Sequence, residues 1–142
     1  HGVPACADFS VDEEPRCWPL DVSTVSAGAF RAAEHHCDAW CISSLVYAEL
    51  QYGLEKGKLL PRSRDSLQKF LGSAPCVSFG SQAAAEAAMV RAELEQLGQP
   101  SGQRDYLIAG HARSLGATLV TANTRHFELV GGIRLENWIP SR

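Results

Sequence analysis

The strongest pattern of apolar and polar positions lies within residues 102–127. After a glycine-containing loop, Ile108, Ala112 and Leu115 recur with helical spacing, and a glycine ends the pattern. The run ATLVT that follows is short and apolar, which predicts a buried strand. Asp105 stands on the first turn of the predicted helix, on the same face as these apolar residues. A carboxylate turned toward a core is unusual for a residue with a purely structural role.

Other stretches of the chain also switch between helical and strand-like patterns. Helices are predicted to begin near residues 43–44, at Pro61 and at Ser81, where a capping residue or a proline precedes an apolar stripe. Short strands are predicted at residues 40–42, 76–79 and 133–139. Strands that alternate with helices indicate an α/β fold, here a three-layer α/β/α sandwich around a mainly parallel sheet.

A second carboxylate stands among apolar residues in the first of these helices. At 100° per residue, Glu49 falls within the apolar arc, whereas Gln51 and Glu55 fall outside it. The arc is formed by Leu45, Val46, Leu50, Tyr52, Gly53 and Leu54. Because an unpaired buried carboxylate is costly, this position favours a metal-binding or catalytic role for Glu49 over a surface role.

The composition is ordinary for a soluble globular domain. The 142 residues are 45% hydrophobic and 20% charged, which suits one domain with a core of its own. Residues 1–15 show no apolar period and carry four acids against no Lys or Arg, so we expect a mobile arm before a domain at 16–142. No apolar run approaches the ~20 residues that span a bilayer, so we expect no membrane partner and a cytoplasmic location.

The cysteine count and the net charge limit which disulfide, metal or nucleic-acid sites the chain can form. Five cysteines with no CxxC pair indicate reduced thiols rather than a disulfide framework. The polar run at residues 34–38, with two histidines and a cysteine, offers a metal site as an alternative, but adjacent side chains diverge. The net charge of −3 means that any nucleic acid must be held by a local patch.

Basic residues gather in one segment, residues 56–69, which holds five of the thirteen Lys and Arg. A cluster of this kind suits contact with RNA phosphates, and the alternative is a solvated charged face. The candidates for RNA binding, here called the basic patch, are Lys56, Lys58, Arg62 and Arg64.

Three runs carry motifs in a specific order: CISSLVYAELQYGLEKG, VRAELEQLGQPSG and DYLIAGHARSLGATLVTANTRHFELVGGIRLENW. Together they resemble the VapC-type toxins of the PIN-domain family, over about residues 39–139. The resemblance is to the subgroup associated with cleavage of initiator tRNA, and it weakens before residue 39. It implies an endoribonuclease toxin of a toxin–antitoxin pair, which forms a homodimer through its helices and is neutralised by an antitoxin protein.

The resemblance also implies which residues form the active site. Glu49 and Asp105 match two of the family's acids, and the run RCWPLDVSTVS aligns Asp21 with another. Carboxylates that meet at the carboxyl edge of the sheet suit Mg²⁺ or Mn²⁺, which activates water for attack on an RNA phosphodiester. Asn123 stands where the family often has a further acid, and we expect it to orient water. His111 is expected to be a packed residue rather than a catalytic base.

The altered first strand leaves a second hypothesis open. Asp21 is alternatively a loop residue, because Pro19 removes a ladder donor and the segment that leads to Cys41 is shorter than in the family. The chain would then be a catalytically weakened PIN module that binds RNA or an antitoxin. The position of Asp21 relative to Glu49 and Asp105 distinguishes the two hypotheses.

Overall fold

The helices and strands follow the predicted alternation. The computed structural model describes residues 20–21, 41–121 and 123–137, and for residues 20 and 21 it describes the backbone. In chain order the elements are β1 (Leu20–Asp21), β2 (Ile42–Ser43), α2 (Ser44–Glu55), α3 (Pro61–Ser73), β3 (Cys76–Val77), α4 (Ser81–Gln96), α5 (Gln103–Leu115), β4 (Thr118–Thr121), the 3-10 helix η2 (Thr124–His126) and β5 (Arg134–Glu136). The four predicted helices are confirmed. The arm predicted at 1–15 and the polar run at 34–38 lie outside the described residues.

Local chemistry explains where the helices begin and end. The Ser43 hydroxyl caps α2 by accepting the backbone N–H of Leu45 at 3.1 Å. Pro61 stands at the start of α3, where a missing N–H breaks no helical hydrogen bond. Gly116 ends α5 in the left-handed conformation, with φ at 63°, and the chain turns from it into β4. Ser81 was predicted to cap α4 but is its first helical residue; the capping position is Gly80, and no side chain caps this helix.

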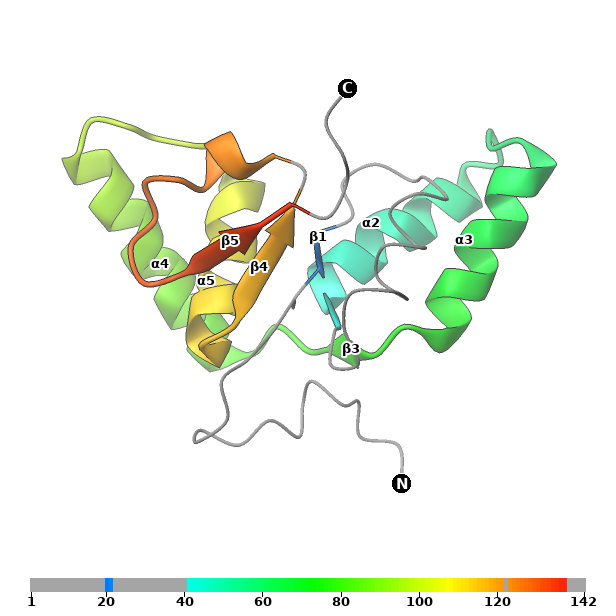
Figure 1. Cartoon of the computed structure of the whole chain (residues 1–142), viewed down its shortest axis with the longest axis horizontal. Helices are drawn as coiled ribbons and strands as arrows, with labels where there is room; N and C mark the ends of the chain where they lie inside the picture. Colours follow the sequence, from blue (N-terminus) through cyan, green and yellow to red (C-terminus); the bar gives the residue numbers. More distant parts are fainter. Residues whose placement is uncertain (1–19, 22–40, 122, 138–142) are drawn as a thin grey trace.

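The strand pairs of the described residues are all parallel. One group has the order β1-β4-β5, and its register places Asp21 opposite Thr121. The other group pairs β2 with β3, and β1 lies close to β2, so the two groups are neighbours. In Figure 1, α4 and α5 lie beside β4 and β5, and α2 and α3 lie on the opposite side of the molecule. The predicted α/β/α sandwich with a parallel sheet is therefore confirmed.

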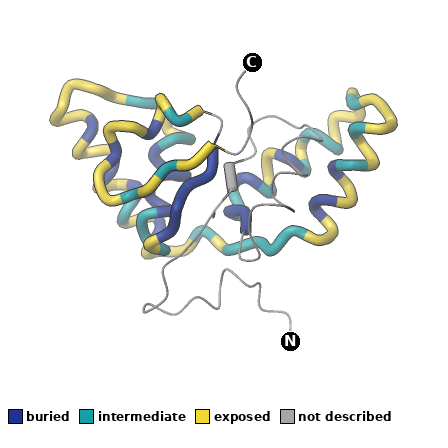
Figure 2. Tube along the Cα trace, viewed as in Figure 1, coloured by how far each residue is buried: buried dark blue, intermediate teal, exposed yellow. Residues whose placement is uncertain are grey.

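The core forms where the helices pack on the strands. Strand β4 is buried along its whole length, as Figure 2 shows. Helix α5 is buried at five consecutive positions, residues 108–112, because α4 covers one face of it and the sheet lies against another. The core residues with almost no exposure include Ile42, Val46, Leu67, Val90, Ile108, Leu119 and Phe127. This packing fixes α5, and with it the position of Asp105.

One residue of the predicted apolar arc is exposed, and so is the residue that follows the apolar stripe of α4. The Tyr52 side chain is on the surface, where the ammonium of Lys56 lies 5.4 Å from the ring centroid. The stripe of α4 is buried at Ala83, Ala87, Val90 and Leu94, but Leu97 comes after the last helical turn and is exposed. A periodic pattern defines the middle of a buried face, and its margins depend on how much the neighbouring element covers.

Candidate active site

Asp105 is held at the start of α5 by contacts from the preceding loop and from η2. Its carboxylate is 15% exposed and lies on the first turn, where the helix dipole favours a negative charge. The Ser101 hydroxyl donates to Asp105 Oδ2 at 2.8 Å, and His126 Nδ1 of η2 lies 3.2 Å from the same oxygen. Because η2 follows β4 by two residues, these contacts place Asp105 near the carboxyl end of β4.

Glu49 of α2 is linked to Asp105 by the side chain of Arg104. Arg104 Nε donates to Glu49 Oε2 at 2.5 Å, and Arg104 Nη1 lies 3.9 Å from Asp105 Oδ1. One guanidinium therefore lies within ion-pair distance of both carboxylates. The expectation of a buried Glu49 is wrong, because its side chain is 43% exposed. Its partner in the structure is Arg104, and the metal-binding or catalytic role of Glu49 remains a prediction.

The other two predicted site positions lie at the same edge of the sheet. The backbone of Asp21 ends β1 and pairs in register with Thr121, the last residue of β4, so β1 exists as the resemblance implies. The Asp21 side chain is outside the described part of the structure. Asn123 is exposed just beyond β4, and its backbone N–H donates to Thr121 Oγ1 at 3.0 Å. The roles of Asp21 and Asn123 therefore remain predictions.

Sequence reasoning missed two residues of the site, Arg104 and His126. A weak signal existed for Arg104, because a cation on the first turn of a helix is opposed by the helix dipole and needs a partner elsewhere. The exposed His126 gave no such signal. Its contact with Asp105 depends on how η2 folds back onto α5, and a local pattern does not encode that approach.

His111 is a structural residue, as expected, and it holds together the two helices that carry the acids. Its Nδ1 lies 2.8 Å from Ser43 Oγ, and the ring packs edge-on against Phe79. Since Ser43 Oγ accepts the N–H of Leu45, its hydroxyl proton is available to donate to Nδ1. Burial lowers the pKa of His111, and a hydrogen bond with the Ser78 backbone opposes this shift. Neutral His111 thus joins α5 to the capping residue of α2.

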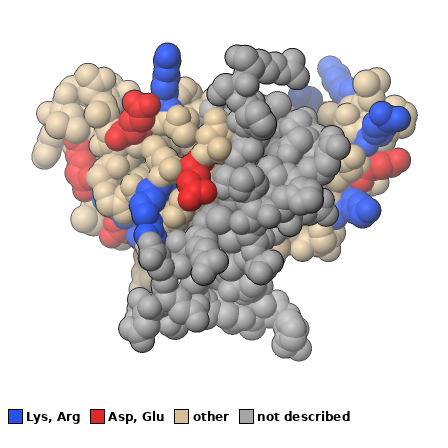
Figure 3. Space-filling model, viewed as in Figure 1, with Lys and Arg blue, Asp and Glu red and all other residues tan. Residues whose placement is uncertain are grey.

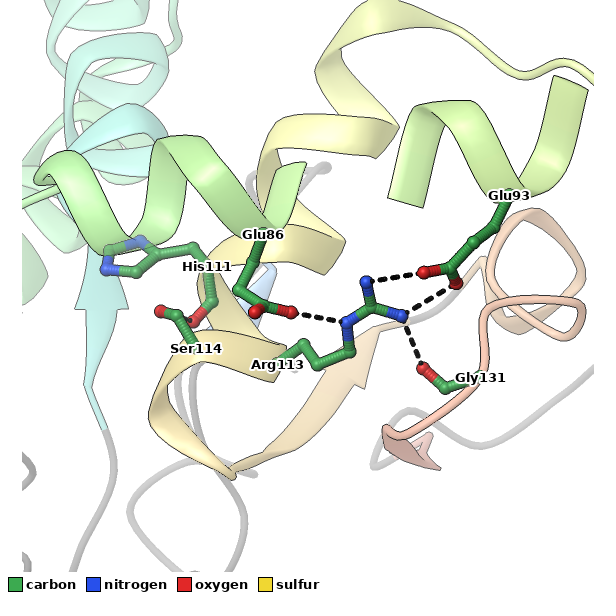
Figure 4. A network of polar contacts seen from close by, with 6 residues as sticks. All are labelled: Glu86, Glu93, His111, Arg113, Ser114 and Gly131. Carbon is green, nitrogen blue, oxygen red and sulfur yellow. Dashed lines mark hydrogen bonds and ion pairs between the residues drawn. The ribbon is translucent and has the colours of Figure 1, made fainter. Parts of the chain in front are cut away.

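A second polar network fixes α5 against α4 and the loop before β5. Figure 4 shows the Arg113 guanidinium between Glu86 and Glu93 of α4, with Nε 2.7 Å from Glu86 Oε1 and Nη1 2.9 Å from Glu93 Oε1. Arg113 Nη1 also donates to the carbonyl of Gly131 at 3.0 Å. These hydrogen bonds lower the pKa of Glu93 and raise that of Arg113. The network has a scaffolding role, since its members stand apart from the contacts made by Asp105.

The two described carboxylates fit a hard divalent cation. Their oxygens already converge on one positive group, and Mg²⁺ in proteins commonly uses only one or two carboxylates together with water or substrate phosphates. Within the described ranges no three His, Cys, Asp or Glu side chains are grouped closely enough to hold a metal. A third carboxylate would have to come from a side chain that the structure leaves undescribed, such as Asp21.

The basic patch is exposed at the end of α2 and the start of α3. All four of its residues are on the surface, and Figure 3 shows basic side chains gathered over this end of the molecule. Glu49 and Lys56 are seven residues apart along α2, which is roughly 10 Å at the rise of an α-helix. Lys56, the patch residue nearest to Glu49 in the sequence, is therefore close enough for one RNA strand to contact both positions.

Comparisons with known proteins agree with this geometry. The family model described as PIN domain matches residues 23–133. The "tRNA(fMet)-specific endonuclease VapC" of Shigella flexneri is 44% identical over 98 residues, which are 69% of this chain and 74% of that protein. The "Ribonuclease VapC2" of Haemophilus influenzae (strain Rd) is 39% identical over 99 residues, covering 70% of this chain and 75% of its own length.

Solved structures point to the same relatives. A chain of DNA-bound VapBC from Salmonella typhimurium aligns with a TM-score of 0.70 and 34% identity, over 84% of this chain and 96% of that one. A chain of VapBC2 from Rickettsia felis, bound to a promoter DNA fragment, aligns with a TM-score of 0.68 and 36% identity, over 80% and 86% of the two chains. Among the described residues, the helices are too short or too polar to cross a membrane.

Proposed function

Since the chain belongs to the PIN-domain family and is a homologue of VapC, we propose that it is a metal-dependent endoribonuclease toxin of a toxin–antitoxin pair. We propose a structured RNA as its substrate, with tRNA as the first candidate, because the Shigella flexneri relative is named for tRNA(fMet). The observation that carries this proposal is the convergence of Glu49 and Asp105 on one cation at the carboxyl edge of the sheet. Ligands of open α/β sheets bind at such edges.

In the proposed mechanism, Glu49 and Asp105, with Asp21, are the residues that would hold the ion beside the RNA. The chemistry that a bound Mg²⁺ or Mn²⁺ supplies is activation of water and stabilisation of charge on the phosphate. Asp105 keeps its orientation because Ser101 and His126 contact the same carboxylate oxygen. Residues of this kind reduce the reorganisation needed when substrate arrives.

The basic patch binds the RNA backbone in this proposal. Its four side chains are exposed: Lys56 and Lys58 follow the end of α2, the helix that carries Glu49, and Arg62 and Arg64 lie on the first turn of α3. Lys and Arg that neutralise phosphates supply affinity without base specificity, so sequence choice must come from the shape of the RNA and from contacts near the acids.

Two protein partners are part of the proposal. A cognate antitoxin is expected, because the solved relatives are VapBC complexes and because a cleft lined by carboxylates accepts a basic side chain. A homodimer is expected through helices, and α4 presents the exposed apolar side chain of Met89, followed by exposed Leu97 at its end.

A second candidate function has one observation in its favour. Pro19 directly precedes β1 in the sequence and lacks the N–H that a ladder hydrogen bond would use, so the stretch that carries Asp21 departs from the family's pattern. A PIN module whose third acid is misplaced would still bind RNA or an antitoxin, but it would hold a divalent ion weakly. Activity measurements separate this function from the leading one.

The experiment is cleavage of purified tRNA by the purified chain with Mg²⁺ or Mn²⁺. We expect cleavage that EDTA stops, and a loss of roughly 100-fold or more in Asp105→Asn, because Asn preserves the shape but removes the charge that holds the ion. Glu49→Gln should behave alike, and the double variant should lose little more than either single one. Glu95→Gln is the matched control, since this exposed acid pairs with Arg91 on α4 at 3.1 Å.

Three outcomes decide between the hypotheses. Metal-independent cleavage, or full activity in Asp105→Asn with an unchanged circular dichroism spectrum, would contradict the mechanism. RNA binding without cleavage under any divalent metal would favour the weakened module.

A further inference from the structure

Arg104 lies between the two acids on which the proposed site depends. Its Nε is 2.5 Å from Glu49 Oε2 and its Nη1 is 3.9 Å from Asp105 Oδ1. The side chain is 34% exposed, so the guanidinium stands at the surface of the site rather than deep within the fold. The contact with Glu49 joins α5 to α2 across 55 positions of sequence.

The position of Arg104 in α5 is unfavourable apart from these contacts. It is the second residue of the helix, where the dipole and the unpaired N–H groups favour anions and oppose a cation. Its neighbour Asp105, in contrast, is the kind of residue that this turn favours. The attraction of two carboxylates offsets the unfavourable placement of the guanidinium.

A divalent ion and this guanidinium compete for the same oxygens. An ion held by Glu49 and Asp105 needs carboxylate oxygens that Arg104 now contacts, and two cations at one place repel each other. Because Arg104 directly precedes Asp105 in the chain, a guanidinium released from Glu49 stays within one side-chain length of the site. A planar guanidinium beside bound RNA is suited to bidentate contact with a phosphate.

We propose that Arg104 is the counter-ion of the metal-free site and becomes a phosphate-binding residue when metal and RNA are present. In the metal-free protein its single positive charge partly offsets the negative charges of Glu49 and Asp105 and lowers the affinity for metal. With the ion bound, its guanidinium is released from Glu49 and contacts an RNA phosphate at the site. The second half of this inference rests on the proposed nuclease function, whereas the first half does not.

The first test measures Mn²⁺ binding by calorimetry on EDTA-treated, dialysed protein without RNA. Arg104→Met keeps the aliphatic stem but removes the charge, and we expect about fivefold tighter Mn²⁺ binding, the size of one exposed ion pair. Arg104→Lys should stay close to the wild type. If Arg104 only braces Glu49 against α5, the Met variant should instead bind Mn²⁺ more weakly. Weaker or unchanged binding overturns the counter-ion role.

The second test uses steady-state cleavage of tRNA at saturating Mn²⁺. Loss of a charged hydrogen bond to phosphate should raise KM about tenfold in Arg104→Met, with partial recovery in Arg104→Lys. An unchanged KM overturns the phosphate contact. Arg91→Met is the matched control, because it removes an exposed arginine that pairs with a glutamate on α4. Its Mn²⁺ affinity and its KM for tRNA should equal those of the wild type. If the wild type cleaves no RNA, the nuclease function fails, while the Mn²⁺ titration still decides the counter-ion role.

Discussion

Replacement of Gly110 by alanine should force α4 and α5 apart. The new Cβ would lie 2.4 Å from the backbone N and Cα of Ala87 and 2.7 Å from its Cβ. Carbon atoms in contact normally stay about 3.5–4.0 Å apart, so the helices must separate by roughly 1 Å. Backbone atoms cannot rotate out of the way as the end of a flexible side chain can.

The expected loss of stability follows from two opposing effects. Overpacking of a tight interface costs about 1–3 kcal/mol, and contact with backbone places this case near 3. The better helix propensity of alanine offsets about 1 kcal/mol. The free energy of unfolding of Gly110→Ala should therefore fall by about 2 kcal/mol, which lowers the Tm by roughly 6–8 °C in a domain of this size.

Gly53→Ala is the matched control for this substitution. Gly53 also lies within a helix, in α2, but a Cβ there would meet only the Leu67 Cδ2 atom at 4.0 Å, an ordinary contact. This variant should gain up to about 1 kcal/mol from helix propensity. Urea denaturation of both variants followed by circular dichroism measures the difference. Equal or greater stability of Gly110→Ala, or an equal loss in both variants, would refute the packing argument.

Gly110→Ala should also weaken metal binding, because Asp105 and Gly110 share α5 and Glu49 does not move with that helix. A shift of about 1 Å in one ligand-bearing element is enough to impair a positioned site. Mn²⁺ titration below the melting range should show lower affinity in Gly110→Ala and wild-type affinity in Gly53→Ala.

Two further predictions concern pH and salt. Burial lowers the pKa of His111, so the folded protein takes up this proton at a lower pH than the unfolded chain does. Stability should be insensitive to this group above about pH 6.5 and should fall as the pH drops from there toward the lowered folded-state pKa. Urea denaturation at pH 7.5 and 5.5 measures how far the free energy of unfolding falls between the two. This fall should be smaller in His111→Asn, whose side chain still accepts a hydrogen bond from Ser43. An unchanged fall would contradict the role given to His111. Alanine at all four positions of the basic patch should weaken tRNA binding and reduce the slope of log K against log salt by about 2–4, as filter binding at several salt concentrations can show. A solvated charged face with no RNA contact would leave that slope unchanged.

The sequence by itself determined the helices, the central buried strand and the place of Asp105 in α5. These features follow from local rules: a capping serine at 43, a proline at the start of α3, a left-handed glycine at 116 and an apolar period between them. The motif order also identified the family, because motifs with the same order and spacing indicate the same fold.

Only the tertiary structure decided which side chains meet at the site. Helical periodicity predicted a buried Glu49, but its side chain is exposed, as is that of Tyr52 in the same part of the arc. The contacts of Arg104 with Glu49 and of His126 with Asp105 join elements that are distant in sequence or folded back by a turn. A periodic pattern predicts which face of a helix or strand is buried, because burial of apolar side chains stabilises the fold. Which side chain of another element a residue contacts depends on how several elements pack together and on the length of the side chains. A local sequence pattern does not contain this information.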